Sequence, residues 1–276
     1  MKPANFLYLC PESLEEAVSI LFSKKEDAKI IAGGQSLLAM LNMRLLSPKI
    51  IVDIKNIKIL YKIKNTKEGL WIGANITQQE LLEFEDLYSI SPLLNKMLPW
   101  VGHYQTRNKG TICGSVAHAD PSSEIPLCLA LLDGKIKLIS QHEERILPAR
   151  DFQKGFLDTA IRPDEIIQSV FFPRLDNRVG VAFNEFSFRQ GDFSILSVGA
   201  ICGSNKITFG LTGLSNKAYI TVFPILTKDE IDDALNDLAW KLKGIDDHIA
   251  SASYRRNLLR EIGKNTIKEA MKCRIK

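Results

Sequence analysis

Residues 110–126, GTICGSVAHADPSSEIP, combine small side chains, hydroxyl groups and two acids. Gly110 and Gly114 leave little side-chain bulk, so backbone N–H groups can approach an anion closely, as in the nests that hold phosphates. The hydroxyls of Thr111 and Ser115 can donate hydrogen bonds to phosphate oxygens. We therefore predict a loop that binds the phosphates of a nucleotide.

An apolar run follows this segment. Ser122 and Ser123 precede residues 125–132, which are rich in leucine and isoleucine. This order predicts a buried helix with a serine at its N-cap. The positive end of the helix dipole would then lie near the bound phosphates.

A second small-residue segment, AGGQS at 32–36, stands between an apolar run at 29–32 and a helical pattern that begins at Leu38. A further strand is predicted at 50–54, so Gly33 and Gly34 lie at the carboxyl end of a strand, where open sheets bind ligands. Two such segments suggest a long diphosphate ligand. The alternative is a simple turn, because AGGQS is not the GxGxxG fingerprint of dinucleotide sites.

Composition limits the class of protein. The chain has 276 residues with 45% apolar content, which suits one large or two modest globular domains. A net charge of +4 is too small to indicate nucleic-acid binding. No apolar run is long enough for a membrane span and no signal peptide is recognisable, so we expect a cytoplasmic protein. Five scattered cysteines argue against a disulfide framework or a metal site in this chain.

The elements that must position these segments follow from capping and periodicity. Capping boxes begin at Ser13 and Thr77, Pro92 starts a further helix, and a hairpin is predicted from residues 57–63 and 70–72. Trp100 could cover a planar ring or simply fill the core. Strands are predicted around 136–138 and at 166–172, and a charged stretch at 174–178 marks a domain boundary. Beyond it we expect three antiparallel strands, at 179–188, 194–202 and 206–214, followed by two helices.

At this point the sequence resembles a known family. Residues 32–54 and 110–126 are similar to the FAD-binding medium subunit of molybdenum hydroxylases, which include the flavoprotein chains of carbon monoxide dehydrogenase, xanthine dehydrogenase and aldehyde-type dehydrogenases. The likeness extends over nearly the whole chain. Its other ordered matches are the opening Phe6 and Pro11 and residues 151–156, 163–166, 189–193 and 253–256.

The resemblance implies an α+β fold. Residues 1–175 would form an FAD-binding domain of the vanillyl-alcohol-oxidase type (PCMH type), made of two α+β subdomains at about 1–56 and 57–175. Residues 176–276 would form a smaller α+β C-terminal domain with a three-stranded antiparallel sheet and helices.

The resemblance also implies a set of cofactor-binding residues. Residues 32–36 and 111–115 would hold the FAD pyrophosphate, and Glu124 would accept hydrogen bonds from the ribose or nearby hydroxyls. Asp120 would line the same groove, or shape an Asx turn. We expect no catalytic residue and no metal ligand in this chain. The full expected set is Ala32, Gly33, Gly34, Gln35, Ser36, Leu37, Gly110, Thr111, Cys113, Gly114, Ser115, His118, Asp120, Ser123 and Glu124.

Four departures from the family pattern stand out. Cys113 replaces a glycine, Glu185 replaces a lysine near the flavin, and Phe188 replaces an arginine. The segment 214–218 also lacks the family's Thr-Pro-x-Arg-like piece. A carboxylate at 185 would disfavour an anionic reduced flavin, whereas a lysine would stabilise it.

The function implied is electron transfer. FAD on this chain would take electrons from iron–sulfur centres of a partner chain and pass them to NAD or another acceptor. Molybdopterin and the iron–sulfur clusters are expected only on the partners, a molybdopterin-binding large subunit and a two-iron two-sulfur small subunit of a hetero-oligomer. The alternative is a noncatalytic flavin- or nucleotide-binding accessory homologue in assembly or regulation. An independent flavin oxidase is a weaker alternative.

Overall fold

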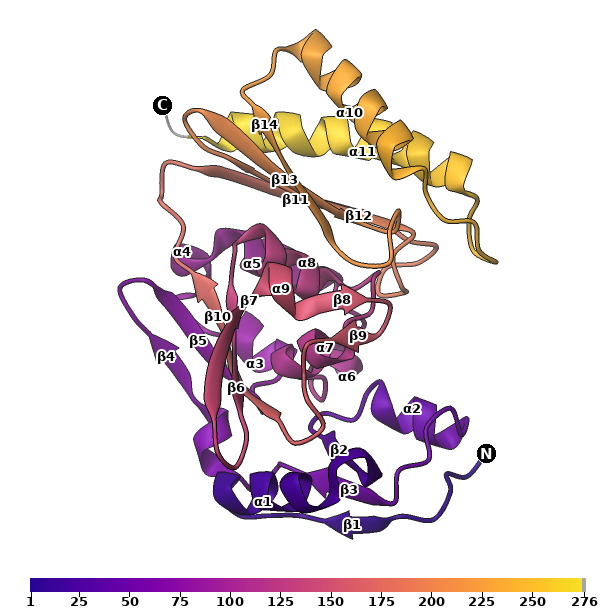
Figure 1. The fold of residues 1–276 in the computed structure, drawn as a ribbon. Coiled ribbons are helices and arrows are strands. Elements are labelled where there is room, and N and C mark those ends of the chain that lie inside the picture. The colour runs from indigo at the N-terminus through magenta and orange to yellow at the C-terminus, as the bar shows by residue number, and fades with distance from the viewer. Residues whose placement is uncertain (275–276) are drawn as a thin grey trace.

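The computed structural model describes residues 1–274, which form three stacked units (Figure 1). The first unit is a small parallel sheet in the order β1-β3-β2. Its elements are β1 (Leu7–Leu9), α1 (Leu14–Lys24), a 3-10 turn (Lys25–Asp27), β2 (Ala28–Ile31), α2 (Leu37–Asn42) and β3 (Ile50–Asp53). The predicted strand, loop, helix and strand order is confirmed. Ser13 caps α1 as predicted, although Glu16 reaches back to the N–H of Glu12 rather than of Ser13.

The second unit is built on a five-stranded antiparallel sheet with the order β4-β5-β10-β6-β7. The strands are β4 (Ile63–Asn65), β5 (Gly69–Gly73), β6 (Lys135–Ile139), β7 (Glu144–Pro148) and β10 (Ile166–Pro173). The predicted hairpin is present, but its first strand is β4 at Ile63–Asn65, so the prediction of a strand over 57–63 is wrong for most of that range. A 3-10 helix occupies Lys58–Tyr61, because Ile57 and Leu60 are both buried and their three-residue spacing suits a helical turn rather than strand alternation.

Short helices cover this sheet and pack with it into one hydrophobic cluster. The Thr77 capping box is complete, with both of its hydrogen bonds formed. Pro92 is the first residue of its helix, as predicted. The elements are α3 (Gln78–Leu82), α4 (Leu87–Ile90), α5 (Pro92–Met97), a 3-10 turn (Leu98–Trp100), α6 (Tyr104–Arg107), α7 (Ile112–His118), α8 (Glu124–Leu131), α9 (Ala149–Phe152) and the small pair β8 (Gln153–Gly155) and β9 (Asp158–Thr159).

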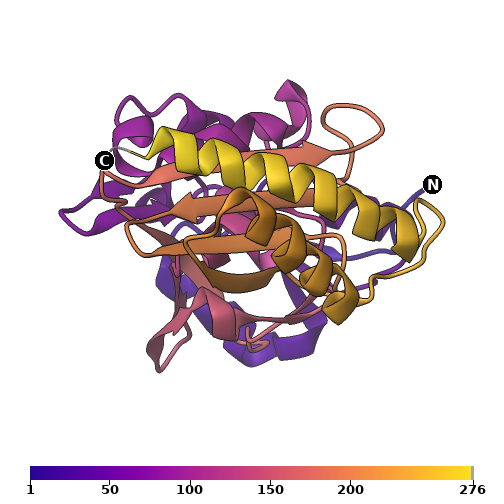
Figure 2. The same ribbon diagram turned by 90° about the horizontal axis from the view of Figure 1, so that it is seen from above.

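The third unit is an antiparallel sheet in chain order, β11 (Gly180–Phe186), β12 (Leu196–Cys202), β13 (Lys206–Thr212) and β14 (Tyr219–Pro224). Helices α10 (Lys228–Leu242) and α11 (Ala252–Cys273) lie across its outer face (Figure 2). The predicted count of three strands is wrong. The fourth strand was missed because none of its residues is buried, so it lacks a clear apolar alternation.

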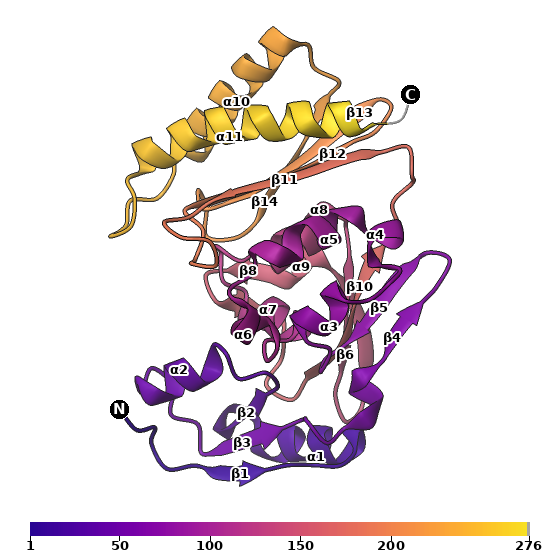
Figure 3. The same cartoon turned by 180° about the vertical axis from the view of Figure 1, so that it is seen from behind.

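The inner face of the third sheet packs on α5 and α8 (Figure 3). Two glycines make this contact close. A Cβ atom added to Gly199 would lie 2.6 Å from Leu131 Cδ1, and one added to Gly210 would lie 2.7 Å from Leu131 Cγ. Helix α8 of the second unit therefore packs directly against the C-terminal sheet. The predicted boundaries at 56 and 175 stay predictions.

None of the helices within residues 1–274 has the length and hydrophobicity needed to cross a membrane.

Candidate functional site

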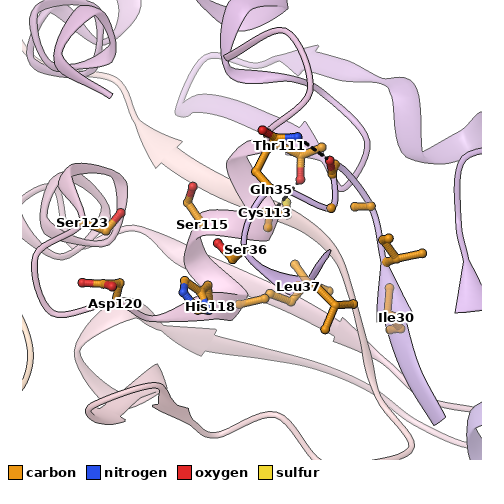
Figure 4. A pocket seen from close by; sticks show the side chains of 18 of the residues that line it. Ile30, Gln35, Ser36, Leu37, Thr111, Cys113, Ser115, His118, Asp120 and Ser123 are labelled. Carbon is orange, nitrogen blue, oxygen red and sulfur yellow. Dashed lines mark hydrogen bonds between the residues drawn. The ribbon is translucent and has the colours of Figure 1, made fainter. Parts of the chain in front are cut away.

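One cavity of about 940 Å³ lies between the first and second units, and a loop of the third unit reaches its wall. Every residue expected from the sequence lines it. Figure 4 labels those among them from Gln35 to Leu37, together with Thr111, Cys113, Ser115, His118, Asp120 and Ser123. The cavity size falls in the range of about 300–1,000 Å³ that is usual for ligand and cofactor sites. The lining residues include Ala32, Gly33, Gly34, Gln35, Ser36 and Leu37 from the first unit and Gly110, Thr111, Cys113, Gly114, Ser115, His118, Asp120, Ser123 and Glu124 from the second.

Glycines allow the two cavity-forming segments to meet. A Cβ atom added to Gly33 would lie 1.9 Å from the carbonyl oxygen of Lys109, so only glycine fits. Gly34 has a φ of +71°, a left-handed conformation that glycine adopts without strain. The segment between β2 and α2 therefore rests directly on the backbone that leads into α7.

The predicted phosphate loop is wrong as a loop over 112–118, because these residues form helix α7. Ile112, Cys113 and Val116 are buried at helical spacing, and Thr111 is the N-cap. Its Oγ1 accepts a hydrogen bond from Gly114 N at 2.9 Å. Since the oxygen is the acceptor in this bond, the hydroxyl proton of Thr111 remains available for donation.

Ser115 is oriented by a residue that the sequence did not single out. Gln78 Nε2 donates to Ser115 Oγ at 3.0 Å, which leaves the Ser115 hydroxyl proton free to be donated into the cavity. Gln78 is itself buried and lines the cavity, and its Oε1 has no hydrogen-bond partner within residues 1–274. Its place in the Thr77 capping box was the only sequence signal, and it did not indicate this contact.

The start of α8 agrees only in part with expectation. Ser123 is the N-cap residue, but its side chain makes no capping hydrogen bond. Asp120 Oδ1 accepts from Ser122 N at 2.7 Å, which is the Asx turn kept as an alternative from the sequence. Glu124, the first residue of α8, is buried, and burial raises its pKa to about 7.

The departure from the family pattern at Cys113 fits the observed backbone. Cys113 sits in α7 and its φ is not positive, so the cysteine meets no backbone strain. Its thiol is buried against the carbonyl of Ile72, and burial raises the pKa of Cys113. Burial lowers the pKa of His118, while Asp120 acts in the opposite direction. No cluster of three His, Cys, Asp or Glu side chains within residues 1–274 has a metal-binding arrangement.

The third unit also reaches the cavity. Gly191, Asp192 and Phe193, in the loop between β11 and β12, line it. Gly191 has a φ of +89° and packs against His103, which holds the loop near α6. Trp100, for which the sequence left two roles open, lies elsewhere. Trp100 packs edge-on against Phe183 in the core and is not a lining residue, which supports the core alternative for Trp100.

Comparison with known proteins identifies the family. Residues 4–175 match the family described as "FAD binding domain in molybdopterin dehydrogenase". The chain is 33% identical to the 6-hydroxypseudooxynicotine dehydrogenase complex subunit alpha of Paenarthrobacter nicotinovorans, over 98% of this chain and 96% of that protein. It is 31% identical to the glyceraldehyde dehydrogenase medium chain of Sulfolobus acidocaldarius, over 98% and 99%. It also matches quinoline 2-oxidoreductase of Pseudomonas putida 86 with a TM-score of 0.93 and 29% identity, over 99% of each chain.

These matches define an oxidoreductase component that binds FAD. The chain belongs to the family of FAD-binding medium subunits of molybdenum hydroxylase-type dehydrogenases. The predicted family, the α+β fold class and the FAD cofactor are thereby confirmed. The roles of the individual lining residues stay predictions.

Proposed function

We propose that the chain is the electron-transfer subunit that takes electrons from iron–sulfur centres of a partner chain and passes them to NAD or another acceptor. The observation that supports it is the cavity in which the glycine-bearing segments of two units meet, lined mostly by residues of the family's FAD-binding domain. Bound FAD supplies the chemistry, because a flavin accepts electrons singly and delivers a pair. No side chain of this chain is required as a nucleophile or general base.

The residues present fit such a cofactor. Residues 32–36 and 111–115 bring glycines and hydroxyls to the wall of the cavity, and we assign them to the pyrophosphate. Ser115 and Thr111 both retain a hydroxyl proton for donation, as the hydrogen bonds to their oxygens show. Asp120, Ser123 and Glu124 line the wall at the start of α8, where we expect polar parts of the cofactor. Leu37 and His118 also line the cavity.

The partners belong to the proposal as well. We infer a hetero-oligomer with a molybdopterin-binding large subunit and a two-iron two-sulfur small subunit, and a cytoplasmic location. Two relatives that match this chain over almost their full length are named as a complex subunit and a medium chain, and these names support the hetero-oligomer. The accessory alternative rested on Glu185, Phe188 and the segment 214–218, and none of these residues lines the cavity. The structure therefore offers no observation that favours the accessory role.

The test uses the full chain together with whatever copurifies with it. We expect a flavin absorbance spectrum that anaerobic dithionite bleaches, with molybdenum and iron in the copurifying chains. After reduction, addition of NAD in the absence of oxygen should restore the oxidised spectrum if NAD is the acceptor. A chain that stays colourless after incubation with FAD would contradict the proposed function, and a flavin that dithionite cannot reduce would contradict the electron-transfer role.

A further inference from the structure

Glu185 lies on the face of the C-terminal sheet that covers α8. Strand neighbours alternate between faces. Phe183, two residues earlier, packs against Trp100 of the second unit, whereas Asn184 donates to Thr266 Oγ1 of α11 at 3.0 Å. Glu185 therefore points, like Phe183, toward the second unit, and it is buried there.

The hydrogen bonds of Glu185 leave one oxygen without a partner. Ser197 Oγ, on the adjacent strand, donates to Glu185 Oε2 at 3.0 Å. Oε1 is buried and has no partner in the part of the chain that the structure describes. The start of α8 lies beside this strand pair, because Ser194 Oγ donates to Ser122 O at 2.9 Å. The carboxyls of Glu124 and Glu185 are close enough there for each to shift the pKa of the other. Two ionised carboxylates cannot bond to each other, but a single proton between them satisfies the unpaired oxygen.

No basic side chain neutralises this pair. Within residues 1–274 neither Glu124 nor Glu185 forms a salt bridge, and a further acid, Asp120, contributes to the raised pKa of Glu124. His118 lines the same cavity, and burial lowers its pKa. On the opposite face of the sheet, Glu269 of α11 is paired with Lys96 at 3.2 Å.

We propose that Glu124 and Glu185 share one proton, and that this carboxylic acid–carboxylate hydrogen bond fastens the C-terminal sheet to the start of α8 at the wall of the cofactor cavity. Burial and, after it, the neighbouring Glu124 together raise the pKa of Glu185 to about 8. Glu185 is a positioning residue, because it acts on the cavity through Glu124.

The position of the pair explains how the proton affects the cavity. Glu124 lines it, and the loop that follows β11 supplies Gly191 and Phe193 to the same wall. Ser194 Oγ at the end of this loop donates to Ser122 O at 2.9 Å, next to the start of α8. When the pair loses its proton, two carboxylates repel each other in a buried place, and the sheet and this loop move away from α8.

The first experiment follows thermal unfolding of the full chain without added FAD between pH 6 and pH 9. The wild-type Tm should fall by roughly 5 °C or more across this range, because the folded state must give up a proton that the unfolded chain has already lost. Glu185→Gln should show a much flatter profile, since its amide donates to Glu124 at every pH. Glu261→Gln, an exposed acid on α11, should keep the wild-type slope. An equally steep profile in Glu185→Gln would overturn the proposal.

A second measurement uses only the wild-type chain, so its result does not depend on whether a variant folds. At pH 6.5 unperturbed carboxyl groups are ionised, so the infrared spectrum of the wild-type chain should show a protonated carboxyl band that disappears by about pH 9. Absence of this band at pH 6.5 would refute the shared proton.

The effect on the cofactor rests on the proposed function and is measured separately. The rate of FAD release from the wild-type chain should rise at least about tenfold between pH 7 and pH 9, and that from Glu185→Gln should stay nearly constant. A pH-independent rate in the wild type would contradict the fastening of the cavity wall. A chain that binds no FAD would contradict the proposed function, while the unfolding and infrared results would still decide whether the proton is shared.

Discussion

Gly33 and Lys109 touch through backbone atoms alone: a Cβ atom at residue 33 would lie 1.9 Å from the Lys109 carbonyl oxygen and 2.9 Å from Gly110 Cα. The contact joins two segments that are far apart in the chain. It fixes the distance between residues 32–37 and the start of α7, and therefore the width of the cavity between them.

The first prediction concerns this contact. Gly33→Ala must push the two segments apart, so we expect FAD affinity to fall at least about tenfold, equivalent to roughly 1.4 kcal/mol. Fluorescence titration of the apoprotein with FAD measures it. Gly203→Ala is the matched control, because a Cβ there would meet its nearest atom at an ordinary 3.6 Å. Wild-type affinity in Gly33→Ala would show that the contact does not set the cavity width.

A second prediction separates helix capping from cofactor binding. Thr111→Val removes the acceptor for Gly114 N, and we expect it to cost about 1 kcal/mol of stability and to weaken FAD binding. Ser13→Ala removes a comparable N-cap on α1, where Glu16 N donates a hydrogen bond to Ser13 Oγ. It should cost a similar amount without changing FAD affinity. Chemical unfolding and FAD titration of both variants decide the point, and equal FAD affinities in the two would contradict a role for Thr111 at the cavity.

The third prediction tests the close packing of α8 on the C-terminal sheet. Gly210→Ala places a methyl group against Leu131 and Ile220, so we expect a loss of about 1–3 kcal/mol in the free energy of unfolding. Leu131→Ala also destabilises the chain by leaving a cavity. The double variant should be less destabilised than the sum of the two, because the added methyl fills part of the space. Strict additivity in urea unfolding would mean that the two residues do not pack on each other.

Much of the site was predictable because its residues cluster in two short segments with an unusual composition. All of the residues expected from these segments line one cavity. Helix α7 was not predicted, since Gly114 in its interior disfavours a helix and the stabilising cap of Thr111 is evident only in three dimensions. The contact of Gln78 with Ser115 joins residues 37 positions apart, so no local pattern announces it.

The position of Glu185 shows a further limit of local reasoning. The sequence placed a carboxylate near the flavin, on the basis of a lysine in related chains. In the structure this residue does not line the cavity, and burial beside Glu124 raises its pKa to about 8. The charge of a buried acid depends on neighbours from other strands and helices, which composition and spacing cannot supply.

The last prediction concerns the ion pair of Arg145 and Glu165. The sequence analysis did not indicate that this pair lies at the cavity. Arg145 Nε and Nη2 donate to the two carboxylate oxygens at 2.6 and 2.7 Å, and the Glu165 side chain is only 2% exposed. Although burial alone would raise the pKa of Glu165, the bonds from Arg145 and from the backbone N–H of Arg162 lower it. Glu165 also lines the cavity, so the ion pair supports the cavity wall.

Removing Arg145 leaves a buried carboxylate without its main partner, and Arg145→Ala should therefore cost about 3–5 kcal/mol near neutral pH. Arg150→Ala breaks an ion pair to Asp133 in which both side chains are more than half exposed, and it should cost roughly 0–1 kcal/mol.

The sign of the pH dependence follows from the lowered pKa of Glu165. The contribution of Glu165 to the free energy of unfolding is fully present above the usual carboxyl pKa. It is lost as the pH falls through the lowered pKa of Glu165. In Arg145→Ala burial dominates, so stability should instead increase as the medium is acidified toward pH 5. Urea unfolding at several pH values measures both effects, and parallel pH profiles for the wild type and Arg145→Ala would contradict this account of the pair.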